Sequence, residues 1–237
     1  MAPINWLDLF QHPLDTWGFV LFLLVFPIYH GIYPLLLTRF FPNRAASTRF
    51  DRFRESWISG IVERRDYLLA AQQTRNLTMV NTVLASSSLI LMGFTANALL
   101  GMGRTANDLT IEGFFGAHPV AEAAKLLLLI AIFGVAFAYC MTSLRHLGHF
   151  ILVVGTDAGL IEELEGPASI YLSNLINRAS NRHTLAVRCL YSATPIFLWL
   201  FDSRLFVALT VFWGFKFIVF QDFSYRLRRP PNPGAPA

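Results

Sequence analysis

Histidines offer the first chemistry that the spacing of residues in this chain suggests. His146 and His149 lie three residues apart, which places both imidazoles on one face of a helix. Together with His30 and His183 they could bind a metal ion or a haem. A metal site needs further ligands at a fixed spacing, and this pair has no such third ligand. The stronger interpretation is histidines bonded to backbone or lipid headgroups, so we expect no metal and no cofactor.

Charged residues within apolar segments are better indicators of function. Ionisable side chains at membrane depth usually face a bundle interior or a cavity. Five such residues lie in or at the ends of apolar blocks: Lys125, Arg145, Arg188, Lys216 and Asp222. Lys125 follows Glu122 by three residues, so a local ion pair on one helix is an alternative for it. Arg145 and Arg188 could pair with Asp222 and tie three helices at one inner boundary, or extend toward lipid phosphates.

A polar face on the second apolar segment has two interpretations. Asn81, Ala85 and Ser88 follow one another at steps of four and three residues, so they share one side of a helix. Small residues let helices approach closely, and amides and hydroxyls can form hydrogen bonds between them. The alternative is a face that lines a water-filled path. We favour helix packing.

The composition is that of a membrane protein with several spans. Of 237 residues, 54% are hydrophobic and only 14% are charged, which is unusual for a soluble domain. The net charge of +4 comes largely from arginine. It indicates topology and anionic lipid headgroups, and it does not suggest nucleic acid as a partner. No motif for nucleotide binding or hydrolysis is present, so we expect no enzymatic activity.

Hydropathy predicts an all-α fold, a polytopic transmembrane helix bundle with five spans. A bilayer core needs roughly 20 helical residues. The expected spans are residues 17–40, 77–100, 120–154, 188–201 and 205–223. Between the first two, residues 42–75 should form a cytoplasmic surface helix, with one apolar side that contains Phe50, Phe53, Trp57, Ile61 and Leu68. A cytosolic helix packed on the spans is an equal alternative.

The last apolar block, residues 185–223, decides the topology. It is too long for one span, and Asp202 and Ser203 interrupt it near its middle. Two spans joined by a tight turn there place every arginine-rich segment inside, with the N-terminus outside and the C-terminus in the cytoplasm. Before this block, Gly166-Pro167 should break the chain, and residues 169–182 should form a separate short helix. Residues 1–225 form one domain, and residues 226–237 form a basic, proline-rich, disordered tail.

Short motifs in order along the chain carry a resemblance to a known family. They are Tyr29-His30, Gln73-Thr74-Arg75-Asn76, Lys125, Ser143-Leu144-Arg145, Arg188 with Tyr191, Pro195 and Trp199, and finally Asp222. With these motifs the chain resembles the domain-of-unknown-function 599 family of integral membrane proteins, found in bacteria and plants. The resemblance implies an integral membrane protein and no particular activity.

The predicted function is an oligomeric channel or transporter for ions or small solutes in the bacterial inner membrane. The alternative is a structural or accessory subunit of a larger membrane complex, and a membrane redox or haem protein is a third hypothesis. The expected partners are the bilayer, anionic headgroups, and either further copies of the chain or other subunits. The candidate intramembrane site residues are His30, Arg75, Asn76, Asn81, Lys125, Arg145, Arg188 and Asp222.

Overall fold

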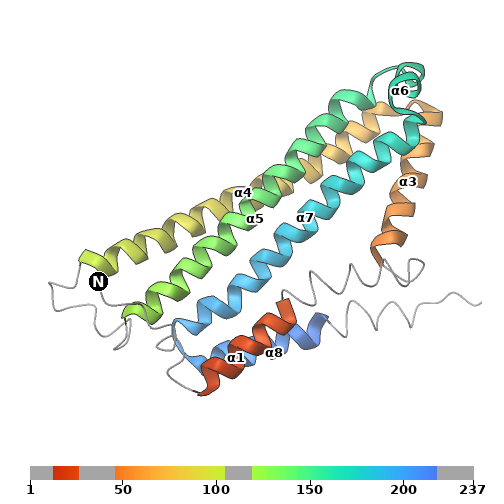
Figure 1. Ribbon diagram of the computed structural model, residues 1–237. Coiled ribbons are helices and arrows are strands. Elements are labelled where there is room, and N and C mark those ends of the chain that lie inside the picture. Colours follow the sequence, from red (N-terminus) through yellow and green to blue (C-terminus); the bar gives the residue numbers. More distant parts are fainter. Residues whose placement is uncertain (1–12, 27–45, 105–118, 218–237) are drawn as a thin grey trace, which may run out of the picture. The chain divides into compact units, whose positions relative to one another are not determined.

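The computed structural model describes residues 13–26, 46–104 and 119–217, and these ranges contain α-helices, with one π-helical turn at 24–26 (Figure 1). The expected all-α class is therefore confirmed for this part of the chain. The chain divides into two compact units. The larger is Ser47–Ala193, and the smaller combines Met1–Ala46 with Thr194–Ala237.

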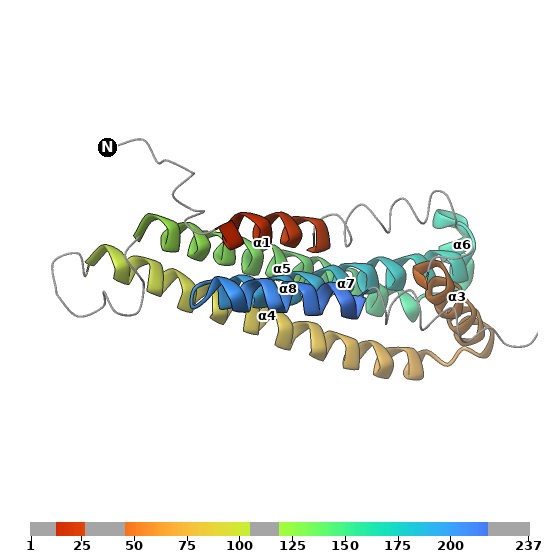
Figure 2. The ribbon, with the colours of Figure 1, turned by 90° about the horizontal axis from the view of Figure 1, so that it is seen from below.

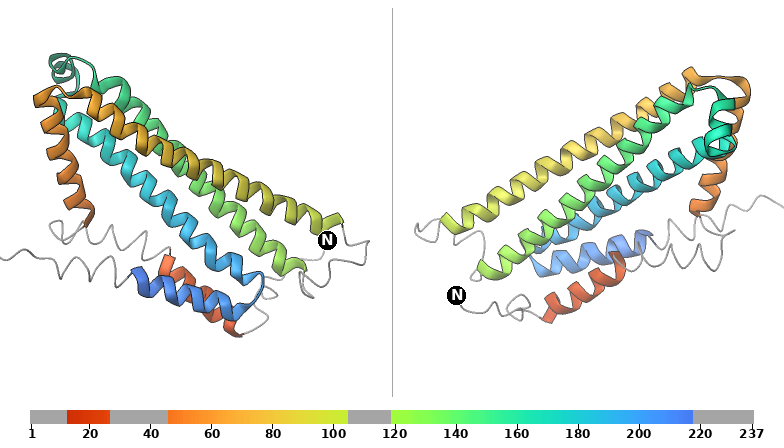
Figure 3. Two further views of the ribbon diagram at one scale, coloured as in Figure 1. Left: turned by 180° about the vertical axis from the view of Figure 1, so that it is seen from behind. Right: turned by 45° about the horizontal axis from the view of Figure 1, so that its top comes forward.

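Three long helices form the body of the larger unit. α4 (Tyr67–Arg104) and α5 (Pro119–Val154) lie side by side, and α7 (Ala168–Trp199) runs beside them as far as Ala193 (Figures 1 and 3). α4 has 38 residues and α5 has 36. At about 1.5 Å per residue, each is far longer than the roughly 30 Å core of a bilayer. Both helices must therefore project well beyond any membrane that they cross.

Two helices in the described ranges are long and apolar enough to span a membrane. They are the segments Tyr67–Gly101 of α4 and Ala121–Val154 of α5. The first segment contains the second expected span, and the second segment matches the third expected span from Ala121 onward. α4 begins ahead of residue 77 because Asp66 caps it, with the Asp66 Oδ1 accepting a hydrogen bond from the Leu69 amide at 3.3 Å.

The expected single surface helix over residues 42–75 is wrong in its extent. α3 (Ala46–Arg64) ends where Arg65 takes a φ of 55°, and α4 begins two residues later. Residues 42–45 lie outside the described ranges. The apolar side is also divided, because Ile61 is fully buried whereas Phe50 and Phe53 are exposed. The fully buried apolar side chains of α3, Ile58 and Ile61, therefore lie in its C-terminal half.

A core of large side chains closes one end of the larger unit. We call it the end core; it comprises Ile58, Ile61, Ala70, Leu147, Phe150, Val154, Leu172, Leu175, Ile176 and Ala179. These residues come from α3, α4, α5 and α7, and Figure 2 shows α3 and α6 (Ala158–Glu165) at that end of the long helices. Gly166 ends α6 with a φ of 86°, which glycine adopts without strain, so the predicted break at Gly166-Pro167 is confirmed.

Farther along the same helices the contacts change to small residues. Ala85 of α4, Cys140 of α5 and Ala186 of α7 form a second buried cluster, which we call the mid-bundle cluster. Cys140 and Ala186 are fully buried. Such side chains keep the backbones close, as in helix pairs within membranes.

The smaller unit pairs α1 (Pro13–Leu23) with α8 (Ser203–Phe217). Gly18 permits the close approach, since a Cβ there would lie 2.8 Å from Cγ2 of Val207. Trp199, at the end of α7, stacks on Phe206 of α8 with ring centroids 4.6 Å apart. The first expected span began at residue 17; the described helical segment is Pro13–Phe26, and the remainder lies outside the described residues.

The last apolar block is interrupted where the sequence predicts. α7 ends at Trp199, α8 begins at Ser203, and the Asp202 carboxylate accepts a hydrogen bond from the Arg204 amide at 2.5 Å. The expected separate helix over residues 169–182 is wrong, however. That segment and the fourth expected span form one continuous helix, α7, of 32 residues. Most polar residues of 169–182 are exposed or half-buried on α7. Other positions of this segment, such as Leu172 and Ala179, are buried, so this part of the helix packs as well.

Candidate functional site

A hydrogen bond between Asn81 and His183 joins α4 to α7 inside the larger unit. Asn81 is fully buried, and its Nδ2 donates to the Leu77 carbonyl at 3.0 Å. Its Oδ1 therefore faces His183, whose Nδ1 lies 3.1 Å away and must carry the proton that is donated. Burial lowers the pKa of His183, which precedes the expected fourth span. Burial thus disfavours the charged imidazolium, and the ring donates to Asn81 through Nδ1.

α5 is tied to α7 by two further polar contacts. The buried Ser143 hydroxyl donates to the Ala179 carbonyl at 2.8 Å. The Arg182 guanidinium carbon lies 5.8 Å from the centroid of the Tyr139 ring, within cation–π range. On α4, the buried Ser88 hydroxyl donates to the Leu84 carbonyl of its own helix at 2.7 Å. Ser143 and Arg182 therefore connect α5 to α7, whereas the Ser88 hydrogen bond stays within α4.

An ion pair lies near the start of α5. Lys125 Nζ is 2.9 Å from Glu122 Oε1, which confirms the local-pair alternative. The two side chains are only 9% and 14% exposed, so the pair is largely removed from solvent. Glu122 Oε2 is buried and has no hydrogen-bond partner within the described part of the chain. A buried carboxylate oxygen without a partner is unusual, because most buried polar atoms form a hydrogen bond.

The other predicted site residues do not gather at one place. Arg75 and Asn76 are exposed on α4, Arg145 is exposed on α5, and Arg188 is partly buried on α7. His30 and Asp222 lie outside the described residues.

The expectation that Arg145 and Arg188 share one boundary is wrong. Ser143 contacts Ala179, whereas Cys140 packs near Ala186, so α5 and α7 run antiparallel. Arg145 lies beyond the Ser143 contact, and Arg188 lies beyond Ala186 in the opposite direction. At about 1.5 Å per residue, the two arginines are more than about 10 Å apart along the bundle.

The histidines do not assemble into a metal site in the described ranges. No group of three or more His, Cys, Asp or Glu side chains there is placed to hold a metal ion. His183 bonds to Asn81, and His149 is exposed on α5.

Asp15 is a functional candidate that the sequence analysis missed. It is 6% exposed on α1 and accepts hydrogen bonds from Trp199 Nε1, at 2.8 Å, and from the Ser203 hydroxyl. The carboxylate thus holds the α7–α8 turn of the smaller unit. An acidic residue beside an apolar run was the available signal, but its partners are 184 and 188 residues away in the sequence.

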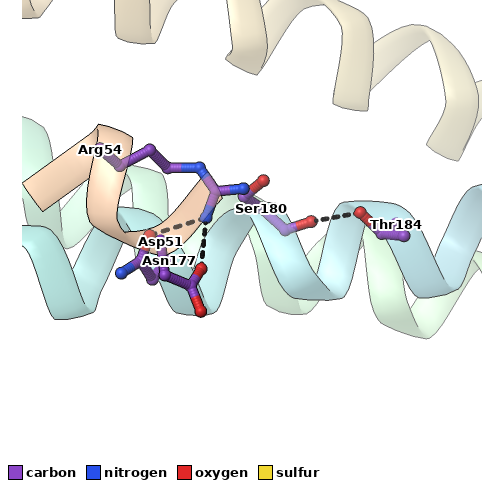
Figure 4. A network of polar contacts seen from close by, with 5 residues as sticks. All are labelled: Asp51, Arg54, Asn177, Ser180 and Thr184. Atoms are coloured by element: carbon purple, nitrogen blue, oxygen red, sulfur yellow. Dashed lines mark hydrogen bonds and ion pairs between the residues drawn. The ribbon is translucent and has the colours of Figure 1, made fainter. Parts of the chain in front are cut away.

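Arg54 is the second missed residue. Its Nη1 donates to Asp51 Oδ1 and to Asn177 Oδ1, each at 2.7 Å (Figure 4). The first contact lies within α3, and the second links α3 to α7. The sequence predicts that all arginines of the surface helix face lipid headgroups. Nothing in the sequence distinguishes Arg54 from the others.

The sequence matches the family described as "Protein of unknown function, DUF599" over residues 17–225. The chain belongs to the DUF599 family. That match covers most of the chain and confirms the resemblance carried by its motifs. No curated protein and no solved structure matches the chain. Family membership therefore gives a relationship without an activity, and function has to be argued from the residues.

Proposed function

We propose that this DUF599 protein is a multi-pass membrane protein that acts as a structural or accessory subunit of a larger membrane assembly. The observation that carries the proposal is the hydrogen bond between the fully buried Asn81 and His183. Asn81 and Ser88 are the polar residues that a water-filled path along α4 would need. Both are buried and occupied by hydrogen bonds, which favours helix packing over conduction.

The proposed topology has five spans, with the N-terminus outside and the C-terminus in the cytoplasm of a bacterial inner membrane. Support comes from the two long apolar helices and from the interruption between α7 and α8. The basic residues of α3 and of the start of α4 then lie inside, as the positive-inside rule requires. Arg204 lies at the outer turn between the last two spans.

Cysteine labelling tests this topology. In a background with Cys140→Ala and Cys189→Ala, the exposed Arg204 and Glu63 are each replaced by cysteine. A membrane-impermeant maleimide should label position 204 in intact spheroplasts and position 63 only after permeabilisation. Labelling of both positions from the same side would contradict five spans.

The assembly is tested by purifying the tagged chain from its native membrane in a mild detergent. We expect other polypeptides to co-purify at a fixed stoichiometry that survives dilution. A homo-oligomer that carries no other subunit would contradict the accessory role and leave the channel hypothesis.

A channel or transporter is the second candidate, and the Glu122–Lys125 pair favours it. An intramembrane ion pair whose second carboxylate oxygen has no partner among the described residues could form part of a proton or cation path. Proton or cation flux into proteoliposomes tests this role. Glu122→Gln should abolish the flux, and the exposed control Glu165→Gln should leave it intact. The accessory role predicts no flux in any of the three proteins.

A further inference from the structure

α3, α4 and α7 enclose an open pocket of about 240 Å³ in the larger unit. It is lined by Arg54, Trp57, Gln73, Thr74, Leu77 and Ile176. Pockets for drug-sized ligands are larger, at roughly 300–1,000 Å³, so this one suits a small group or the head of a larger molecule.

Arg54 is fixed in this pocket with donors to spare. Both of its hydrogen bonds, to Asp51 and to Asn177, leave from Nη1 (Figure 4). Nη2 and Nε make no hydrogen bond within the described residues, and the side chain is 26% exposed. A guanidinium that is held on one nitrogen is pre-organised to bind an anion through the others, and its fork matches two oxygens of a phosphate.

The other lining residues restrict the class of ligand. The exposed Gln73 supplies an amide donor, while Leu77 and Ile176 supply apolar wall. A ligand that satisfies both the polar donors and the apolar wall must carry an anionic group and a hydrocarbon part. Asp51 and the exposed Glu55 oppose an anion. Arg54 itself and two exposed arginines outnumber them, because Arg75 adjoins Thr74 and Arg178 adjoins Asn177 in the sequence.

Exposed aromatic residues on α3 favour a lipid over a soluble anion. Phe50 and Phe53 are 44% and 63% exposed, and their rings pack edge to face with centroids 6.3 Å apart. Exposed phenylalanines beside arginines are typical of helices that lie in a membrane interface. Such a helix would bring Arg54 to the depth of the headgroups.

We propose that this pocket binds the phosphate group of an anionic phospholipid. Arg54 donates to the phosphate through Nη2 and Nε, Gln73 contributes an amide, and the acyl chains leave past Leu77 and Ile176. The inference requires the chain to lie in a membrane and is independent of whether it acts as a subunit or a channel.

Native mass spectrometry of the full-length protein in mild detergent tests the proposal. The protein is titrated with phosphatidylglycerol, with phosphatidylcholine, or with inorganic phosphate. Phosphatidylglycerol should bind to wild type, and Arg54→Gln should lower its affinity about tenfold, as expected for loss of charge-assisted hydrogen bonds. Arg52→Gln is the matched control, because it removes the same charge from an exposed position of the same helix.

A second variant keeps the test valid if Arg54→Gln fails to fold. Gln73→Phe fills the pocket from an exposed position and leaves the Arg54 contacts to Asp51 and Asn177 in place. It should lose phosphatidylglycerol binding without loss of thermal stability. Three results would each overturn the proposal. The first is an equal loss of phosphatidylglycerol affinity in Arg54→Gln and Arg52→Gln, and the second is undiminished binding in Gln73→Phe. The third is saturation of the protein by inorganic phosphate alone at the same concentration.

Discussion

The end core and the mid-bundle cluster lie on the same three helices but are built from different residues. The end core contains Phe150, Leu147 and Leu172, each at most 1% exposed, and it recruits Ile58 and Ile61 from α3. The mid-bundle cluster consists of Ala85, Cys140 and Ala186. Interhelical hydrogen bonds from Asn81 and Ser143 lie alongside the small residues.

The two arrangements suit two different solvents. In water, burying large apolar side chains stabilises a fold by roughly 25 cal/mol per Å² of area. In a bilayer that driving force is lost, because lipid tails are as apolar as leucine, and helices associate through close packing and hydrogen bonds. The contrast agrees with the proposed topology if the middle of the bundle lies in lipid and the end core begins at the headgroups and extends into water.

The largest expected effect lies in the end core. Phe150→Ala should destabilise the protein by about 3–5 kcal/mol, because it removes a fully buried ring and leaves a cavity. Leu152→Ala is the matched control, since Leu152 is 78% exposed two residues away on α5. Unfolding in detergent, followed by circular dichroism, measures both. Similar losses for the two variants would mean that no aqueous core exists at this end.

A smaller effect is expected when the mid-bundle cluster is overpacked. Ala186→Leu should cost about 1–3 kcal/mol, because the added atoms have no space beside Ala85 and Cys140. Ala131→Leu, at an exposed position of α5, should be close to neutral. The midpoint temperature of thermal unfolding measures both variants. A neutral Ala186→Leu would contradict close helix contact in the middle of the bundle.

Local signals predicted much of the fold. Gly166 ends α6 through its backbone freedom, and Asp202 caps the start of α8; both effects depend on a few neighbouring residues. The failures involve tertiary contacts. Residues 169–182 appeared separate from the fourth expected span because the polarity of the chain changes there, yet both parts pack within one helix.

The candidate site was predictable only as a set of residue types. The spacing of Asn81, Ala85 and Ser88 indicated a buried face, and all three are buried. It could not indicate His183 as the partner, 102 residues away, because register between helices depends on how their surfaces fit. For the same reason the charge pattern misplaced Arg145 relative to Arg188, and the role of Asp15 went unrecognised.

The Asn81–His183 bond should contribute less than either kind of packing. Asn81→Ala, His183→Ala and the double variant form a cycle whose coupling energy we expect at about 0.6–2 kcal/mol, the range for hydrogen bonds between membrane helices. Asn174→Ala, at an exposed position of α7, controls for loss of an amide. Additive single effects would show that the contact does not tie α4 to α7.

The smallest effect should be a dependence of stability on pH. Because burial lowers the pKa of His183 in the folded protein, below about pH 6.5 the unfolded chain binds a proton that the folded chain resists. Stability should therefore fall as pH drops from about 7 toward the folded pKa, and it should be unaffected by His183 at higher pH. His183→Asn should flatten this part of the curve, whereas His149→Asn, at an exposed position, should not. If wild type and His183→Asn have the same pH profile, water reaches the imidazole in the folded protein, and burial does not lower its pKa.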